Sequence, residues 1–300
     1  MRVFLTGATG FIGSRIVPEL ITAGHEVLGL TRSDEGAATL IRAGAQVYRG
    51  TLEDPETLAR GAAQADAVIH TAFDHDFSNF VANCEKDQRV IEAIGDTLAG
   101  SDKPFLITSG VGMGNGAPGE TALEQRFDRN NANPRKLSEM AGEAVAARGV
   151  SVAVVRLPQV HDTQRQGLIT PMIEIARARG FVAYVGEGAE RWSAAHVTDV
   201  ARLYRLALDR HAAGARYNAV AEEGVSARQI AEAIGRRLGI PVRSLTAEQV
   251  PQYYGAFAHF ATMDLPASGQ WTRKHLDWTP TGPVLLSDLE HLNDKSGPAR

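Results

Sequence analysis

Three glycines near the start of the chain have the spacing of a site for a diphosphate. Gly7, Gly10 and Gly13 lie in the segment VFLTGATGFIGSRIV, between an apolar run and an amphipathic one. The first glycine allows a tight exit from a strand, the second lets backbone amides approach phosphate oxygens, and the third lets a helix pack closely on the sheet. The N-terminus of that helix adds partial positive charge. This order of strand, turn and helix indicates a dinucleotide site.

The turn also contains the other residues that we expect to touch the cofactor phosphates, Thr9, Phe11 and Ile12. An ordinary turn that binds nothing is the alternative interpretation. Three glycines at this spacing carry a conformational cost that an ordinary turn does not require. We therefore favour the binding site.

The end of the second expected strand indicates which dinucleotide is preferred. A carboxylate there accepts a hydrogen bond from the ribose 2′-hydroxyl, whereas arginine and hydroxyl groups receive a 2′-phosphate. This chain has Thr31, Arg32 and Ser33 at the strand end, and Asp34 lies further into the loop. The sequence therefore predicts NADP, with NAD as the alternative. An ordinary solvated surface arginine is the competing interpretation of Arg32.

Short apolar runs alternate with longer helical stretches, which predicts parallel strands joined by crossover helices. The runs are continuously apolar because helices cover both faces of such a sheet. We expect strands at 3–6, 27–31, 47–49, 67–70, 105–108 and 152–156. The fold class is therefore α/β, a Rossmann-type doubly wound parallel sheet with a smaller C-terminal substrate lobe.

Residues 1–160 are expected to form the NAD(P)-binding domain, and residues 161–300 mainly the substrate-binding lobe. The lobe contains helical patterns at 168–179, 197–209 and 226–238, and the second of these is expected to pack back onto the main sheet. The polar tail from Ser287 is expected to be mobile.

Composition limits the classes of partner. The 300 residues carry a net charge of −4 without blocks of like charge, which argues against nucleic acid. A single cysteine, Cys84, cannot form an intramolecular disulfide, and the histidines show no paired spacing for zinc. No apolar run approaches a membrane span, and an expected strand from residue 2 leaves no room for a signal peptide. We expect a soluble cytoplasmic protein without metal, nucleic-acid or membrane partners.

The segments TGATGFIG, GTLED, VIHTAF, LITSG, VVRLPQVH and RWSAAHVTDVARLYRLAL follow one another in an order that resembles the extended and atypical short-chain dehydrogenase/reductase superfamily, in its NAD-dependent epimerase/dehydratase branch. The resemblance covers essentially the whole chain. It implies a cofactor groove lined by His70, Thr71 and Ala72, with Thr108 and Ser109 beneath the nicotinamide. It also implies nicotinamide contacts from Pro158 and Val160, and it places Ser109 at the family's catalytic Ser/Thr position.

The chain departs from this family at its proton-transferring pair, a tyrosine with a lysine four residues later. The matching segment NANPRKLSE puts Asn131 in the tyrosine position, Arg135 in the lysine position and Glu139 at the family's glutamate. Asparagine cannot titrate and arginine stays charged, so neither shuttles a proton in the usual way. Arg135 can still hold the cofactor ribose.

Several groups could replace the missing acid and base. The candidates are Tyr184, His161, Asp162, a water held by Ser109, or no group at all, and each side chain also has an ordinary structural interpretation. Two functions follow. We favour an NADP-preferring oxidoreductase that acts by hydride transfer on a small carbonyl, alcohol or sugar-like substrate; a catalytically altered NADP-binding redox sensor is the alternative.

The resemblance also suggests an oligomeric state. Helices expected near 77–99 and 134–148 resemble those through which extended members of the family pair as dimers. Four alanines keep the second helix slim enough for close packing, Ala141, Ala144, Ala146 and Ala147. A homodimer is therefore expected, with simple coverage of the sheet as the alternative use of this surface.

Overall fold

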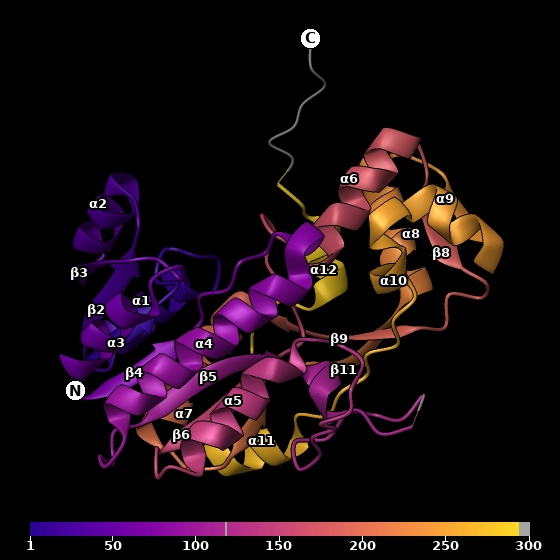
Figure 1. Ribbon diagram of the computed structural model, residues 1–300. Helices are drawn as coiled ribbons and strands as arrows, with labels where there is room; N and C mark the ends of the chain where they lie inside the picture. The colour runs from indigo at the N-terminus through magenta and orange to yellow at the C-terminus, as the bar shows by residue number, and fades with distance from the viewer. Residues whose placement is uncertain (118, 294–300) are drawn as a thin grey trace.

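The computed structural model describes residues 1–117 and 119–293 and has a parallel sheet at its centre (Figure 1). The sheet has seven strands in the order β10-β6-β5-β4-β1-β2-β3. Their bounds are β1 Arg2–Thr6, β2 Glu26–Thr31, β3 Gln46–Arg49, β4 Ala67–His70, β5 Phe105–Gly110, β6 Val152–Leu157 and β10 Arg216–Asn218. The chain starts at β1, builds outward to β3 and then continues from the other side of β1 at β4. Ligands of open parallel sheets bind beyond the carboxyl ends of strands at such a reversal.

Helices cover both faces of the sheet, as the continuously apolar strands predicted. One face carries α1 (Gly13–Thr22) and α7 (Val197–Asp209), and the other carries α3 (Pro55–Ala63), α4 (Phe80–Leu98) and α5 (Lys136–Ala146). The helix α2 (Asp34–Arg42) packs beside β2 and β3. This arrangement confirms the doubly wound α/β fold.

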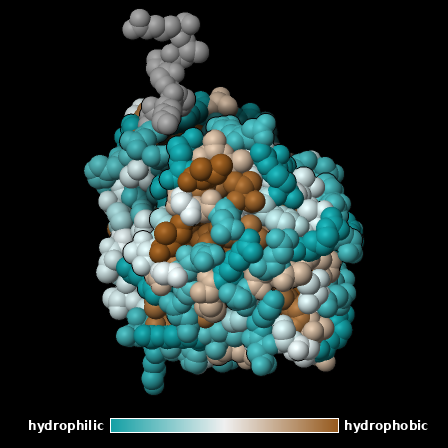
Figure 2. Space-filling view, turned by 90° about the vertical axis from the view of Figure 1, so that its left-hand side faces the viewer, coloured by the Kyte–Doolittle hydropathy of each residue, from teal (hydrophilic) through white to brown (hydrophobic). Residues whose placement is uncertain are grey.

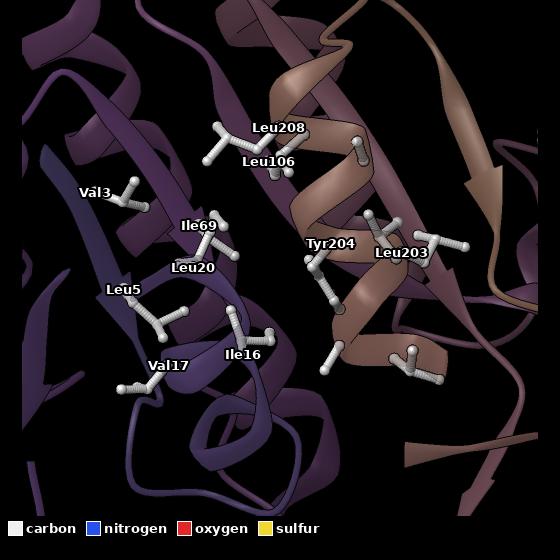
Figure 3. Close-up of a cluster of buried hydrophobic side chains, with 14 of the residues drawn as sticks. Val3, Leu5, Ile16, Val17, Leu20, Ile69, Leu106, Leu203, Tyr204 and Leu208 are labelled. Atoms are coloured by element: carbon white, nitrogen blue, oxygen red, sulfur yellow. The ribbon is translucent and has the colours of Figure 1, made fainter. Parts of the chain in front are cut away.

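Alternate residues of each strand enter opposite cores because successive side chains of a strand point to opposite faces. Leu5 of β1 and Leu106 of β5 pack against α1 and α7, close to Tyr204 of α7 (Figure 3). Their neighbours Phe4 and Phe105 enter the core under α3, α4 and α5. The two cores hold the sheet rigid beneath its carboxyl edge.

A second lobe follows β6 and has its own core. It contains a three-stranded sheet of β7 (Gln159–His161), β9 (Arg191–His196) and β11 (Glu222–Ser226), and a two-stranded sheet of β8 (Val182–Val185) and β12 (Val242–Leu245). Its helices are α6 (Ile169–Arg179), α8 (Ala227–Leu238), α9 (Val250–Tyr254), α10 (Ala258–Ala261) and α12 (Leu285–Glu290). Ser226 begins α8 with a capping box to Gln229, and Gly239 ends it at φ 67°.

The chain returns to the first sheet after residue 160. The helix α7 packs against α1, and it is followed by the seventh strand, β10, which the sequence did not predict. The helix α11 (Gln270–Leu276) contacts both β10 and α7. Residues beyond 160 therefore contribute to both parts of the molecule.

The expectation of a mobile tail from Ser287 is wrong for residues 287–293. Ser287 lies within α12, and the next residue, Asp288, is 2% exposed and bonded to His161. The remaining part of that prediction, 294–300, lies outside the described residues.

The surface is mostly hydrophilic. On the face shown in Figure 2, apolar side chains gather mainly in one area surrounded by polar ones. None of the helices in the described part of the chain combines the length and the apolar character needed to span a bilayer.

Candidate cofactor and substrate site

The turn between β1 and α1 owes its shape to its three glycines. Gly7 has φ +68°, and a Cβ there would lie 2.8 Å from both Ala72 N and Thr71 Oγ1. A Cβ on Gly13 would lie 2.1 Å from the carbonyl oxygen of Gly7, so α1 could not pack this closely on the turn. A Cβ on Gly10 would meet only that same oxygen, at 3.1 Å, and would otherwise face open space. Gly7 and Gly13 are therefore required by the fold, while Gly10 keeps the outer side of the turn free.

A pocket opens on this free side of the turn. Its walls come from the turn and α1 on one side and from the loop after β7 on the other. The lining residues are Thr9, Gly10, Phe11, Ser14, Arg15, Asp162, Gln164 and Arg165. The pocket lies at the carboxyl end of β1, where the strand order reverses, and that is the place where this fold class holds a dinucleotide.

The end of β2 has one free guanidinium group. Arg32 is exposed and makes no hydrogen bond or ion pair with the described residues. Ser33 begins α2, and its hydroxyl accepts a hydrogen bond from Gly36 N at 3.1 Å. The carboxylate of Asp34 is paired with Arg49 at 2.5 Å. The acid nearest in sequence to the end of β2 is therefore paired with a cation.

His70, which the family resemblance placed in the groove lining, lies below the groove instead. It is 1% exposed, so it supports the groove and does not line it, whereas Thr71 and Ala72 are half-buried. Thr6 Oγ1 accepts the amide hydrogens of Thr71 and Ala72 at 3.1 and 3.2 Å and lies 2.7 Å from His70 Nδ1. Thr6 must then donate its own proton to Nδ1, which leaves Nε2–H to donate to Asp87 Oδ1 at 3.0 Å.

The buried carboxylate of Asp87 connects this series of hydrogen bonds to Arg135. Arg135 Nη1 donates to Asp87 Oδ2 at 2.6 Å, and Ser138 Oγ donates to the same oxygen at 2.6 Å. Burial opposes ionisation of Asp87, but the Arg135 guanidinium and the hydrogen bonds from His70 and Ser138 outweigh it and lower the pKa of this carboxyl. Asp87 is thus an anion whose charge Arg135 balances.

Arg135 also fixes the edge of β5 and the loop after β4. Its Nη2 donates to the Thr108 carbonyl at 2.9 Å, and its guanidinium lies 4.1 Å from the ring centre of Phe73. Thr108 Oγ1 donates to the His70 carbonyl at 2.7 Å, so the Tyr204 hydroxyl, also at 2.7 Å, donates to Thr108. Burial raises the pKa of Tyr204, which therefore stays protonated. These contacts hold the ends of β4 and β5 together.

Ser109 has a different environment from its neighbours. It is 3% exposed, and its hydroxyl has no hydrogen-bond partner among the described residues. A buried hydroxyl without a partner carries a desolvation cost that a bound ligand can remove. Ser109 is therefore a side chain at the carboxyl end of β5 whose hydroxyl is left unpaired by the described residues.

Asn131, which the family resemblance placed at the tyrosine position, is engaged in hydrogen bonds to the protein backbone. Its Nδ2 donates to the Gly112 carbonyl at 3.0 Å, and its Oδ1 accepts from Asn133 N at 2.9 Å. Glu139 holds Arg156 through two hydrogen bonds of 2.8 Å, with neither side chain exposed. Asn131 and Glu139 are thus both committed to contacts within the protein.

The structure does not bring Tyr184 to this region, which corrects the expectation that it could supply the proton. Tyr184 lies on β8, in the second lobe and well apart from β5 (Figure 1), where Arg228 lies 5.8 Å from its ring centre. His161 is fully buried and bonded to Asp288 at 2.7 Å. Asp162 accepts the amide hydrogens of the following loop. The two residues expected at the nicotinamide, Val160 and Pro158, are buried in the core beside α7 and half-buried, respectively.

Sequence reasoning missed Thr6, Asp87 and Ser138. Asp87 lies on the same helical face as Val90, Ile91 and Ile94, all of them buried. A charged residue on an otherwise apolar helical face is the signal that could have found it, because a buried carboxylate requires a partner. Within the described ranges, no group of three or more histidine, cysteine or acidic side chains could hold a metal ion.

Comparison with known proteins identifies the family. The NAD dependent epimerase/dehydratase family matches residues 3–220, and the chain belongs to it. The fold and the site define a member of the short-chain dehydrogenase/reductase class, as the resemblance implied. Its glycine turn, and the Ser109 hydroxyl that has no partner in the described part of the chain, fit a nicotinamide dinucleotide.

Particular relatives are found in yeasts and bacteria. An uncharacterized protein of Schizosaccharomyces pombe is 45% identical over 96% of this chain and 98% of its own length. A UDP-glucose 4-epimerase of Streptomyces lividans is 26% identical over 98% of this chain and 94% of its own. The Thermus thermophilus UDP-glucose 4-epimerase, solved with NAD, has the same fold, with a TM-score of 0.73 at 21% identity over 99% of this chain and all of that one.

Proposed function

We propose that this protein is an NADP-preferring oxidoreductase that transfers a hydride to or from a small carbonyl, alcohol or sugar-like substrate. The observation that carries the cofactor preference is at the end of β2. Arg32 is exposed and has no partner among the residues that the structure describes, and Asp34 is paired with Arg49 at 2.5 Å. A free guanidinium beside the N-terminus of α2 is suited to a 2′-phosphate, and a neutralised carboxylate no longer repels one.

Each part of the site has a separate role in the proposed reaction. When bound, the nicotinamide ring supplies the hydride chemistry. The glycine turn holds the diphosphate, and Thr71 and Ala72 form the groove beside it. Ser109 donates a hydrogen bond to the substrate oxygen, where negative charge develops during reduction, and keeps its proton. Arg135 positions the Thr108 carbonyl through their hydrogen bond. The proton for the substrate oxygen then comes from water.

Replacing Arg32 tests the cofactor preference. Arg32→Ala is expected to weaken NADPH binding at least about tenfold and to leave NADH binding unchanged, because only NADPH carries the 2′-phosphate. Calorimetric titration of both nucleotides measures this. Arg42→Ala, at the other end of α2, is the matched control for loss of a surface charge. Equal weakening of NADPH and NADH by Arg32→Ala would remove the argument for NADP.

A redox sensor is the second candidate, and one observation favours it. Asn131 and Arg135, in the positions of the family's proton-transferring pair, are both engaged in hydrogen bonds that shape the protein. NADPH oxidation across a panel of aldehydes, ketones and keto-sugars separates the two functions. Turnover with any of them supports the enzyme, whereas tight NADPH binding without turnover supports the sensor.

We further propose that the protein works in the cytoplasm as a homodimer, paired through α4 and α5. These helices pack against each other on one face of the sheet, and Met140 of α5 and Val81 of α4 are 36% and 58% exposed. Ala144, Ala146 and Ala147 add small exposed side chains, whereas Ala141 is buried. Light scattering is expected to give twice the chain mass, and Met140→Arg is expected to reduce it. A strictly monomeric mass for the wild type would rule out the dimer.

A further inference from the structure

The loop after β7 has a fixed shape before any ligand binds. Asp162 is 7% exposed, and its Oδ1 accepts the amide hydrogens of Gln164 and Arg165, each at 2.7 Å. The amide of Asp162 donates to the Arg165 carbonyl at 2.9 Å. The side chain of Gln166, 1% exposed, donates to the Asp162 carbonyl at 2.5 Å. The backbone at Arg165 is therefore held from several directions.

The side chain of Arg165 extends from this loop toward the glycine turn. Its guanidinium carbon lies 5.9 Å from the ring centre of Phe11, and both residues line the same pocket. Arg165 is exposed and has no ion pair with the described residues. Arg15 Nη2 lies 3.6 Å from Asp162 Oδ2, so the one carboxylate of the pocket has its own counter-ion. One positive charge therefore remains unbalanced.

We propose that Arg165 clamps the cofactor diphosphate from the side opposite the glycine turn. The backbone amides of the turn would hold one side of the diphosphate, and the planar guanidinium would donate two parallel hydrogen bonds to oxygens on the other side. Arg15 acts as a positioning residue, since it neutralises Asp162 and thereby limits the repulsion between this carboxylate and the phosphates. The proposal rests on the nucleotide binding of the proposed function and adds a residue from outside the glycine turn.

Loss of Arg165 is expected to change ligand affinities in a different pattern from loss of Arg32. NADH and NADPH share the diphosphate, so loss of Arg165 must weaken both by the same factor. Adenosine 2′-monophosphate carries the 2′-phosphate without a diphosphate, so its binding must depend on Arg32 and not on Arg165. ADP-ribose carries the diphosphate without the nicotinamide and must show the full effect of losing Arg165.

The experiment compares Arg165→Gln and Arg165→Lys with a control, Arg148→Gln. Arg148 is an exposed arginine just after α5 that pairs with Asp96. Affinities for NADH, NADPH and ADP-ribose are measured by calorimetry at low and high salt, and adenosine 2′-monophosphate is measured by competition with NADPH. Arg165→Gln is expected to weaken the three diphosphate ligands about tenfold or more and to make their binding less salt-dependent. Arg165→Lys keeps the charge and loses the planar fork, so it is expected to fall between wild type and Arg165→Gln.

The outcomes separate the proposal from the function on which it rests. If Arg165→Gln binds ADP-ribose and both dinucleotides like wild type, the clamp is disproved while nucleotide binding stands. If Arg165→Gln weakens only NADPH and adenosine 2′-monophosphate, Arg165 contacts the 2′-phosphate and the diphosphate assignment is wrong. If the wild type binds none of the four ligands, the proposed function itself fails. Arg148→Gln must match wild type for the comparison to support the clamp.

Discussion

The guanidinium of Arg135 and the carboxylate of Asp87 form a largely buried ion pair 2.6 Å apart. Arg135 begins α5, and Asp87 comes from the middle of α4. The ion pair links two parts of the site, because Asp87 also accepts a hydrogen bond from His70 and Arg135 also donates one to the Thr108 carbonyl. Arg135 thus acts as a structural support between α4 and the ends of β4 and β5.

Removing the charge of Asp87 tests this support. Asp87→Asn leaves the Arg135 guanidinium, 14% exposed, without its counter-ion. Loss of one partner from a buried pair is expected to lower the free energy of unfolding by about 3 kcal/mol at pH 7, measured by urea denaturation. Asp96→Asn on the same helix removes an exposed partner of Arg148 and is expected to cost less than about 1 kcal/mol. Similar losses in both variants would contradict the assignment.

The same ion pair is expected to make the free energy of unfolding depend on pH in the acidic range. The pKa of Asp87 in the folded protein is lowered, as described above, so its contribution is fully present above the unfolded pKa of about 3.9 and is lost as pH falls toward the folded pKa. The difference in unfolding free energy between wild type and Asp87→Asn is therefore expected to be constant from about pH 5 to about pH 7. It is expected to shrink below about pH 4. A difference that grows on acidification would show that the carboxyl is not stabilised as an anion.

Two glycines of the same turn are expected to respond in opposite ways. A Cβ at Gly13 would lie 2.1 Å from a backbone oxygen, so Gly13→Ala is expected to cost about 1–3 kcal/mol of stability. Gly10→Val meets one backbone oxygen at 3.1 Å and otherwise fills the space proposed for the diphosphate. It is expected to retain most of the stability and to lose dinucleotide binding. Urea denaturation and calorimetry measure the two effects, and intact NADPH binding by Gly10→Val would overturn the proposed site.

Ser109 is expected to matter for turnover and not for cofactor affinity. Ser109→Ala removes the hydroxyl proposed to meet the substrate oxygen, and turnover with a reducible carbonyl is expected to fall about 100-fold or more. Ser193→Ala on β9 is the matched control, since Ser193 is also buried, at 2%, with a hydroxyl that lacks a partner in the described part of the protein. NADPH affinity should be unchanged in both. Full turnover by Ser109→Ala would exclude the proposed role.

His196, which lies at the junction of β9 and α7, is expected to give the free energy of unfolding a second dependence on pH. Burial lowers the pKa of His196, although Asp288, 3.7 Å away, opposes the shift. A folded pKa below the unfolded value of about 6.5 gives a contribution that is present above that value and is lost as pH falls through the folded pKa. Unfolding free energy is therefore expected to decrease from pH 7 to pH 5, by at most about 1.4 kcal/mol per pH unit for each proton.

The variant His196→Asn isolates this group. Asparagine can replace the hydrogen-bond acceptor that His196 offers to Thr198 N at the start of α7, and it does not titrate. The decrease between pH 7 and 5 is expected to become shallower, as measured by urea denaturation at several pH values. An unchanged slope would show that His196 does not contribute to it.

The sequence predicted the framework of this fold and only part of the site. Strands such as Ala67–His70 are short, apolar and followed by helical periodicity, and these local signals identified the first six strands of the sheet. The seventh, Arg216–Asn218, has no such pattern, because its strand character comes from pairing with β6, more than sixty residues earlier. The glycine turn could be predicted because all of its parts are contiguous.

The polar groups around Ser109 show why the rest could not be predicted. Asp87 and Arg135 are 48 residues apart and meet only after α4 and α5 have packed on the sheet. Tyr184 looked equally available from the sequence, yet pairing of β8 with β12 holds it in a separate sheet. Spacing along the chain carries no information on which of two distant side chains enters a site. Tertiary packing decides it.

The repeated return of the chain to the central sheet has a mechanical consequence. Segments pass from one half of the molecule to the other after β6, again from β9 into α7, back from β10 into β11, and once more around α11. A single break in the backbone therefore cannot release either half, and neither half is continuous enough to be produced alone by simple truncation. Opening of the ligand cleft must bend several connections at once, which favours small, stiff movements over wide swings about a single hinge.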